Sequence, residues 1–226
     1  MKRSIVITAA AMLAAIALPG AEILHQDFED TKIFKAEGKQ DKQVGLSKNI
    51  GGNWLGFNGS DFRIVRENAP GEGEQALQIS RVNPAVRLSA FRTVELPQDR
   101  AYTVRLMIKP GSTDKCFFGF LLRNSFADQE AARIQFGNQN MILSVVNGRG
   151  QLVMRSTPNE WQELRFTVTP GIDTLKAEKV TADGKAGPGN STPLVKGVPV
   201  NQIVFFNIPG STESALIDNV EISFAD

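Results

Sequence analysis

The sequence predicts an all-β protein that folds as a two-sheet antiparallel sandwich, and two features of its pattern carry this prediction. Many short segments alternate between apolar and polar residues, as strands do when one face is buried and the other meets water. Clusters of Gly, Pro, Asn and Asp separate these segments at short intervals and mark turns. After the N-terminal apolar run, no stretch sustains a helical period for three turns. About a dozen closely spaced strands are typical of a two-sheet sandwich.

The expected strands follow one another along the chain with few long interruptions. They are residues 62–67, 101–109, 116–123, 132–136, 141–146, 151–155, 163–169, 202–208 and 215–224. Two long polar segments, 35–53 and 182–197, are expected to be loops, and 126–133 is compatible with a single helical turn. The sequence contains no internal repeat and no interdomain linker, so we expect one domain.

The N-terminal segment has the pattern of a secretory signal peptide. Two basic residues precede the apolar run 4–18, and small, turn-prone residues follow it up to Ala21. The run is too short for a good membrane span, and no later segment is long and apolar enough to cross a membrane. We therefore expect a signal peptide over 1–21, a single β-sandwich domain over 22–226, and a secreted or periplasmic protein without integral membrane association.

The charge and cysteine content of the chain give no support for nucleic-acid binding or for an internal disulfide. Without Lys2 and Arg3 the chain has 23 basic and 24 acidic residues, so bulk charge gives no argument for nucleic acid. Cys116 is the only cysteine, and no internal disulfide can form. We expect Cys116 to behave as a small buried apolar residue and the fold to depend on a large core.

Five segments, taken in their order along the chain, resemble concanavalin A-like (laminin G-like) jelly-roll sandwiches and the similar secreted jelly-roll carbohydrate-binding modules. The segments are "DFED" (27–30), "GEGEQALQIS" (71–80), "LPQDRAYTVRLMIKPGS" (96–112), "NEWQELRFTV" (159–168) and "ALIDNVEISF" (215–224). The resemblance covers nearly all of the expected domain and implies a jelly-roll fold. It is poorly specific for function, because the same sandwich serves lectins, glycanases, lyases and adhesion modules.

The acidic residues at the two ends of the domain are candidates for a metal site. Strand alternation places Asp218 on the same face as Leu216 and Val220, and a carboxylate on an apolar face needs a partner or a metal. The resemblance implies that the first and last strands lie side by side and that Glu29 and Asp218 hold a structural Ca²⁺, with Asp27 as a further candidate ligand. The alternative is that Asp218 caps backbone amides or pairs with an arginine.

No recognised catalytic set is present in the sequence. A retaining glycosidase of this fold would carry an E-x-D-x-(x)-E run, which is absent. Lyases of this fold depend on Tyr and His, whereas the only tyrosine, Tyr102, begins a core-like strand and the only histidine, His25, lies at the expected mature terminus. There is no G-x-S-x-G, no metal-spaced Cys/His set and no phosphate loop. We therefore predict no catalytic residue.

Two aromatic residues are candidates for stacking on sugar rings. Trp54 and Phe57 lie in the glycine- and asparagine-rich stretch "GGNWLGFNGSDF" (51–62). Flat aromatic faces bind sugar rings, so we interpret this stretch as a glycan platform. The alternative is that Trp54 packs onto the sandwich as a lid.

Five arginines fall in expected strands beside apolar residues, and three of them are our candidate glycan ligands: Arg105, Arg123 and Arg133, with Arg87 and Arg165 as the others. Several guanidinium groups on one sheet face would suit carboxylated or sulfated polysaccharides. The alternative is cross-strand pairing with Glu and Asp on a solvated face.

The sequence thus favours an exported, non-catalytic carbohydrate-binding protein that recognises an extracellular polysaccharide or oligosaccharide, acidic ones included. An enzyme of the same fold that degrades polysaccharide, by hydrolysis or lyase chemistry, is the second hypothesis. A structural or adhesion module that binds protein is the third.

Overall fold

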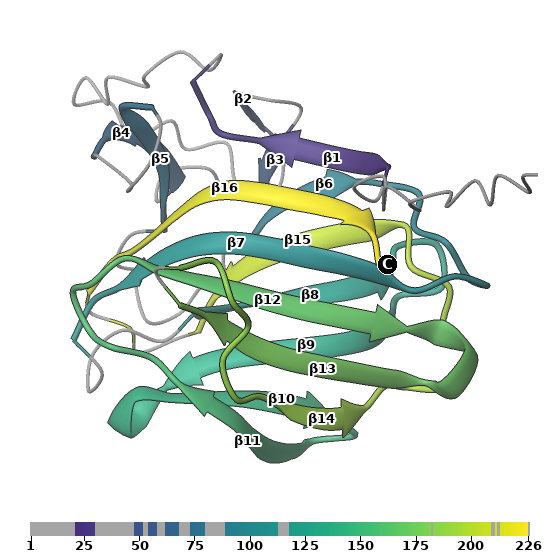
Figure 1. Cartoon of the computed structure of the whole chain (residues 1–226). Helices are drawn as coiled ribbons and strands as arrows, with labels where there is room; N and C mark the ends of the chain where they lie inside the picture. The colour runs from purple at the N-terminus through teal and green to yellow at the C-terminus, as the bar shows by residue number, and fades with distance from the viewer. Residues whose placement is uncertain are drawn as a thin grey trace, which may run out of the picture.

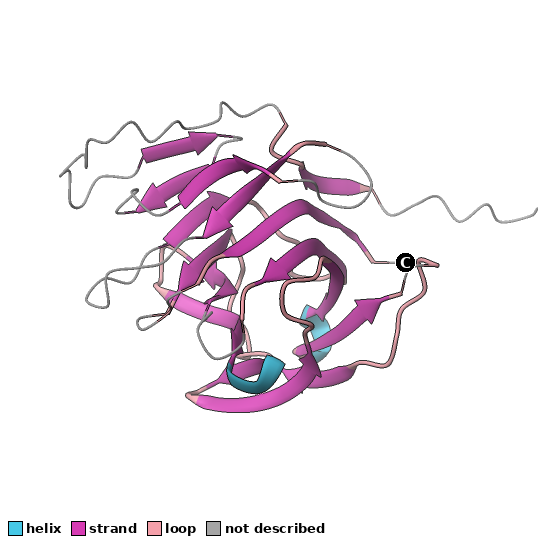
Figure 2. Cartoon of the chain, turned by 90° about the vertical axis from the view of Figure 1, so that its left-hand side faces the viewer, coloured by secondary structure: helices cyan, strands magenta, loops and turns pink. Residues whose placement is uncertain are grey.

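The computed structural model describes residues 21–29, 48–51, 54–57, 62–67, 73–79, 89–112, 118–181, 183–208, 211 and 213–225. In these ranges two antiparallel sheets pack face to face, and the only helical elements are the short turns η1 (Asn138–Asn140) and η2 (Pro170–Ile172) (Figures 1 and 2). The prediction of an all-β, two-sheet antiparallel sandwich is confirmed. No helix in the described part of the chain is long and apolar enough to span a membrane.

The two sheets are built from strands that are mostly distant in sequence. The first sheet has the order β14 (Asn190–Pro193), β13 (Thr174–Val180), β12 (Gln162–Thr169), β7 (Tyr102–Pro110), β16 (Ala215–Phe224), β5 (Gln75–Ile79) and β4 (Phe62–Arg66), and β1 (Glu22–Gln26) also pairs with β16. The second sheet has the order β11 (Arg149–Arg155), β10 (Met141–Val146), β9 (Gln129–Gly137), β8 (Phe118–Asn124), β15 (Gln202–Asn207), β6 (Ser89–Thr93), β3 (Trp54–Phe57) and β2 (Lys48–Gly51).

Strand β7 shows how the sequence pattern becomes a sheet with one buried face. Tyr102, Val104, Leu106 and Ile108 are fully buried, whereas the residues between them are half-buried. Successive side chains of a strand point to opposite faces, so the alternation sends the apolar set into the space between the sheets. Strand β15 differs, because all six of its residues are buried and it lies in the middle of the second sheet.

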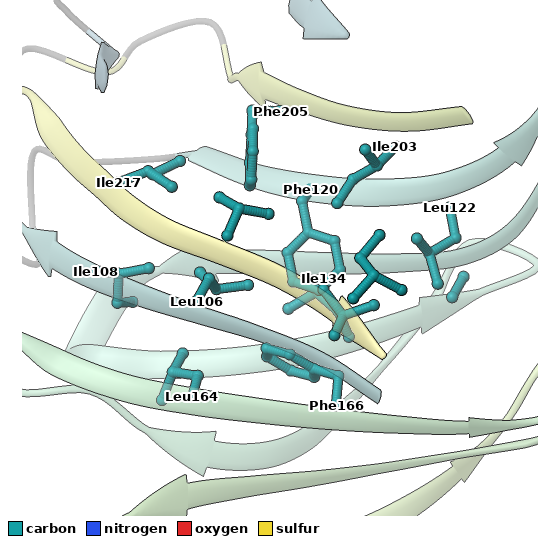
Figure 3. Close-up of a cluster of buried hydrophobic side chains, with 14 of the residues drawn as sticks. Leu106, Ile108, Phe120, Leu122, Ile134, Leu164, Phe166, Ile203, Phe205 and Ile217 are labelled. Atoms are coloured by element: carbon teal, nitrogen blue, oxygen red, sulfur yellow. The ribbon is translucent and has the colours of Figure 1, made fainter. Parts of the chain in front are cut away.

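The core is a layer of aromatic and aliphatic side chains from the inner faces of both sheets (Figure 3). Phe120 of the second sheet packs edge-on against Phe166 of the first, with ring centroids 4.9 Å apart. Phe205 contacts Phe120 in the same way at 6.3 Å. This burial of large apolar area stabilises the fold through the hydrophobic effect, in a chain with a single cysteine.

A glycine in β8 marks where this packing leaves no room for a side chain. A Cβ atom on Gly119 would lie 2.2 Å from the carbonyl oxygen of Ile134 and 2.7 Å from the ring of Phe206. Glycine inside a strand commonly marks such a close approach. The glycine in the middle of the expected buried strand is therefore required by its neighbours.

The first and last strands of the domain lie side by side, as predicted. Strand β1 pairs antiparallel with β16, and Gln26 lies opposite Val220 (Figure 1). The same edge of β16 pairs with β5 from Ala215 to Ile217. Between these two pairings lie Asp218 and Asn219, which no described strand pairs with on this edge, and Asn219 adopts a left-handed φ of 45°.

Several sequence-based boundaries hold and others shift. Strands β10 and β16 have the predicted bounds, whereas the segments expected to be loops contain β2 and β14. The segment expected to be compatible with a helical turn instead closes the β8–β9 hairpin and begins β9. Residues 1–20 and Cys116 lie outside the described residues, so the signal peptide and the buried thiol stay predictions.

Candidate functional site

A polar groove of about 610 Å³ lies between the first half of β9, the end of β10 with the turn that follows it, and residues 195–198. We call it the β9 groove. Its polar lining consists of Gln129, Glu130, Arg133, Asn147 and Lys196. Donors, acceptors and both signs of charge thus meet in one concave surface, as in sites where a few polar groups fix the orientation of a ligand.

Arg133 makes several contacts inside this groove. Its Nε–H donates to Oε2 of Glu130 at 2.7 Å, and its Nη2 donates to Oε1 of the same carboxylate. Its guanidinium carbon lies 5.5 Å from the ring centroid of Phe206, within cation–π range. A guanidinium has five N–H donors, so this pairing fixes the fork and leaves donors for a ligand.

One wall of the groove, residues 195–198, belongs to a segment that we call the strap, residues 194–200. The Leu194 amide donates to the carbonyl of Asp173 at 2.7 Å, and the Val195 amide donates to the carbonyl of Ala131 at 2.9 Å. Asp173 immediately precedes β13 of the first sheet, and Ala131 belongs to β9 of the second. The strap therefore ties the two sheets together at one end of the sandwich.

The turn that closes the β8–β9 hairpin presents an aromatic ring to solvent. Phe126 is 92% exposed. Oδ1 of Asn124 accepts hydrogen bonds from the Phe126 and Ala127 amides at 2.9 and 3.1 Å, and Oδ1 of Asn201 accepts from the Ser125 amide at 2.8 Å. The turn is held in one geometry, three residues before Gln129 of the groove. Sequence reasoning missed Phe126; an aromatic among small polar residues in "NSFADQE" was the available signal.

The three arginines chosen as glycan ligands do not lie on one surface. Arg105 is on β7 of the first sheet and pairs across strands with Glu163 at 2.6 Å and Glu221 at 3.2 Å. Arg123 and Arg133 are on β8 and β9 of the second sheet. Cross-strand pairing, the alternative interpretation, thus accounts for Arg105.

Arg123 stays near the groove but is occupied by a neighbouring carboxylate. Its Nη2 lies 3.3 Å from Oδ1 of Asp128 in the hairpin turn. Arg165 lies opposite Arg105 in the β7–β12 pair of the first sheet, and Arg87 lies outside the described residues. Arg133 is therefore the predicted arginine that lines the groove.

Trp54 is in the core. It is 0% exposed and stacks on Phe205 with ring centroids 5.2 Å apart, and Phe28 approaches it at 6.3 Å. A buried indole has no face to offer a sugar, so this arrangement assigns Trp54 to packing in place of the stacking platform. The backbone of Phe57 pairs with that of Ser89, and its side chain lies outside the description.

The acids proposed as metal ligands meet where β1, β5 and β16 join. Glu29 accepts hydrogen bonds from the amides of Glu74 and Gln75 at the start of β5, both at 2.7 Å. Asp27 accepts from the Glu29 amide at 3.1 Å. Asp218 accepts from the Asn219 amide at 2.8 Å. Backbone amide capping, one of the predicted alternatives, is thus present for Asp218.

Asp218 is an acid in an unfavourable environment. It is 1% exposed, and burial raises the pKa of its carboxyl from 3.8 to about 7. The hydrogen bond from the Asn219 amide lowers this pKa, whereas the nearby negative charges of Glu29 and Asp27 raise it. No lysine or arginine of the described ranges forms an ion pair with Asp218.

The oxygen donors around Asp218 are of the type that a hard cation prefers, but their side chains do not form a complete coordination site. A buried carboxylate with acids beside it and no cationic partner in the described chain is an oxygen-only donor set, which suits Ca²⁺. Within the same ranges, however, no three His, Cys, Asp or Glu side chains gather closely enough to hold a metal ion. A calcium site here would have to use fewer carboxylates and add backbone carbonyls.

The residues considered for catalysis lie away from the groove. His25 is half-exposed on β1, and its Nδ1 lies 3.7 Å from Oε2 of Glu22. Tyr102 is buried between the sheets. Among the described residues that line the groove, Glu130 supplies the carboxylate, and it is paired with Arg133. Retaining hydrolysis uses two facing carboxyl groups, which this lining does not bring together.

No protein-family model matches the sequence, and no curated protein matches it. Solved structures resemble the fold over most of the chain. A sialidase has a TM-score of 0.62 at 14% identity, over 92% of this chain and 19% of that chain. A GH131 β-glucanase catalytic domain from Podospora anserina has 0.57 at 12%, over 92% and 97%. Lectin I-B4 from Griffonia simplicifolia has 0.50 at 10%, over 79% and 96%.

These likenesses establish the fold. The protein has a concanavalin A-like jelly-roll sandwich, as its resemblance implied. It spans about a fifth of the sialidase, 19%, and nearly all of the glucanase domain and the lectin. Because one fold can carry binding or catalysis, its function has to be argued from the residues of the groove.

Proposed function

We propose that this protein binds an extracellular polysaccharide or oligosaccharide without cleaving it, through the β9 groove. The observation that carries the proposal is the Arg133 guanidinium, fixed by Glu130 inside a polar groove. Sugar hydroxyls pair well with such fixed forks and with side-chain amides. The lectin and glucanase folds among the structural neighbours support a carbohydrate ligand.

The groups around the groove divide the work of recognition. Arg133 donates to hydroxyl groups, whereas the side-chain amides of Gln129 and Asn147 both donate to and accept from them. Phe126 supplies the exposed aromatic face that a sugar ring stacks on, which replaces the role we had expected of Trp54. Lys196, exposed on the strap, favours glycans with carboxylate or sulfate groups.

The proposal also includes export of the protein and a structural calcium ion. The basic start, apolar run and small residues up to Ala21 support secretion or periplasmic location. A structural Ca²⁺ bound by Glu29 and Asp218, with Asp27 nearby, would neutralise charge that burial disfavours. The ion would stabilise the β1–β16 pairing, and the groove along β9 in the other sheet would not depend on it for contacts.

The test is a glycan array with the mature protein, followed by titration of the best ligand with two arginine variants. Arg133→Ala should weaken binding at least fivefold, while Arg105→Ala should leave it unchanged. Arg105 is a matched control, because it is also a paired strand arginine but lies on the other sheet. Equal effects of the two variants would overturn the assignment of the groove.

The enzyme hypothesis is tested with the same protein and the same ligands. Release of reducing ends would show hydrolysis, and release of unsaturated sugars would show lyase chemistry. Either result, obtained with wild-type protein and lost in Glu130→Gln, would replace the non-catalytic proposal. An array without any glycan hit, together with a protein ligand, would favour the adhesion hypothesis.

A further inference from the structure

A second cavity, of about 330 Å³, lies between the two sheets on the inner side of the strap. Tyr102 and Val168 contribute to it from the first sheet, and Leu122 and Ala131 from the second. All four belong to the hydrophobic core. The cavity is therefore a partly open recess at one end of the core. The strap forms one of its walls, and most of its lining differs from that of the β9 groove.

The lining of this cavity is mainly apolar. Valine, leucine, alanine and proline side chains make up most of it, with Gln98, Asp173 and Tyr102 as the polar members. Gln98 donates to the carbonyl of Leu96 at 2.8 Å, so one of its N–H donors is already used. A cavity water needs two to four polar partners, and few remain here. The space suits an apolar occupant better than a chain of waters.

Tyr102 gives the cavity one specific polar contact. Tyr102 is only 1% exposed. Some buried side-chain atoms of this protein are fully enclosed and have no hydrogen-bond partner, but the Tyr102 hydroxyl is not one of them. No hydrogen bond of this hydroxyl is formed with the described chain, and Tyr102 lines the cavity, so its hydroxyl is available to an occupant. Burial raises the pKa of the Tyr102 phenol well above its ordinary value, so the group is a neutral donor at any physiological pH.

Charge excludes some occupants. An anion would lie in an apolar space near the carboxylate of Asp173, and a buried charge without a partner is strongly unfavourable. A cation would have to leave water for a lining of aliphatic side chains. A neutral molecule with an apolar body and an acceptor oxygen avoids both the burial of an unpaired anion and the desolvation of a cation. The volume lies at the small end of ordinary ligand pockets, about 300–1,000 Å³.

We propose that this cavity binds an uncharged, mainly apolar small molecule whose oxygen accepts a hydrogen bond from the Tyr102 hydroxyl. Medium-chain esters, ketones and alcohols are the chemical class. The site is distinct from the proposed glycan groove, because Tyr102, Leu122 and Val168 do not line that groove, although the two share part of the strap as a wall.

The experiment is a calorimetric titration of the mature protein with methyl octanoate, with octanoate as a charged probe of similar size. Saturable binding of the ester, and binding of octanoate at least tenfold weaker, are expected. Tyr102→Phe keeps the ring and removes the donor, so it should weaken ester binding by about 3- to 10-fold, the usual effect of one hydrogen bond. Absence of saturable ester binding to the wild-type protein would overturn the proposal.

Two further variants keep the result interpretable. Ala131→Leu places extra carbons in the cavity and should abolish ester binding, with circular dichroism and a melting curve to verify the fold. Arg133→Ala, in the groove, should leave ester binding unchanged. Ester binding that survives both Tyr102→Phe and Ala131→Leu would place the ester elsewhere and refute this site. Absence of glycan binding to a wild-type protein that still binds the ester would refute only the groove.

Discussion

The indole of Trp54 lies stacked on the phenyl ring of Phe205, with ring centroids 5.2 Å apart and planes 27° from parallel. The two residues belong to β3 and β15, which are separated in the second sheet by β6. Their contact extends the hydrophobic core from β15 past β6 to β3, where the ring of Phe28 packs against Trp54. A large aromatic at this point stabilises the edge of the sheet that the shorter strands form.

The first prediction concerns this contact. Trp54→Ala should lower the free energy of unfolding by about 3–5 kcal/mol, because it leaves a cavity where a buried aromatic was. Trp54→Phe should cost less, since a ring remains against Phe205. Denaturant unfolding followed by circular dichroism measures both. A stable Trp54→Ala protein that has lost glycan binding would contradict the packing role and restore the platform interpretation.

A second prediction follows from the buried carboxyl of Asp218. Its pKa is about 7 in the folded chain, against an ordinary value of 3.8. Between these values the folded state keeps a proton that the unfolded state has lost, so the free energy of unfolding should fall as pH rises from about 4 to about 7 and then level off. Glu29 and Asp27 are the titratable groups acting on it. Denaturation in EDTA across this range measures the slope.

The matched variant for this slope is Asp218→Asn. It removes the ionisable group and keeps its size, so the decline between pH 4 and pH 7 should become much shallower. At pH 8 the variant should be more stable than the wild type by about 2–4 kcal/mol, since each pKa unit corresponds to about 1.4 kcal/mol. An unchanged pH profile would show that Asp218 is not the group responsible.

The third prediction is the effect of calcium. If Ca²⁺ binds only the folded chain, the melting temperature at pH 8 should rise with calcium concentration and fall again in EDTA. The ion also favours ionised Asp218, so millimolar calcium should flatten the pH slope that EDTA reveals. Glu29→Gln should weaken both effects. Identical melting curves with calcium and with EDTA would count against the site.

The fourth prediction concerns the exposed ring of Phe126. Phe126→Ala should weaken glycan binding by roughly 1 kcal/mol, about fivefold, through loss of stacking. Its stability should change by less than about 0.5 kcal/mol, because the ring contacts solvent. Ile172→Ala is the control, since Ile172 is also exposed, at 70%, but belongs to η2 and not to the β8–β9 hairpin that leads into the groove. Equal losses of affinity would remove the stacking role.

The fifth prediction separates acidic from neutral ligands. Binding that uses the positive charge of Lys196 should weaken as salt rises, because exposed charge contacts are screened within about 10 Å at 0.1 M ionic strength. Lys196→Gln should abolish that salt dependence and leave binding of a neutral glycan intact. A salt-independent affinity for an acidic glycan would limit the groove to hydroxyl recognition.

The fold was predictable because alternation reports burial directly. Strand β7 alternates in the sequence except at Met107, and its alternate residues are buried in the structure. The arginines show the limit of this information. Alternation sends Arg105 and Arg133 outward from their strands, but it does not say to which of the two sheets a strand belongs. That depends on pairing between distant strands, which a single sequence does not encode locally.

The aromatic residues were harder to place, because local composition and final position disagreed. Trp54 lies among glycines that indicate a loop, yet it is in β3 and buried under Phe28 and Phe205. Phe126 lies in a segment compatible with a helical turn, yet two asparagine side chains cap a hairpin turn there. The juxtaposition of Asp218 with Glu29 was predicted through the resemblance, since first and last strands adjoin in that fold.

The strap has one more consequence, because Val195, Gly197 and Val198 line both the groove and the inner cavity. A molecule inside the sandwich that prefers one position of this shared wall would change the affinity of the outer site. Thermodynamic linkage then requires the reverse effect to be of equal size, so a bound glycan would tighten or loosen the ester by the same factor. Measuring each affinity with the other ligand saturating would show whether this protein is a simple receptor or a heterotropic one.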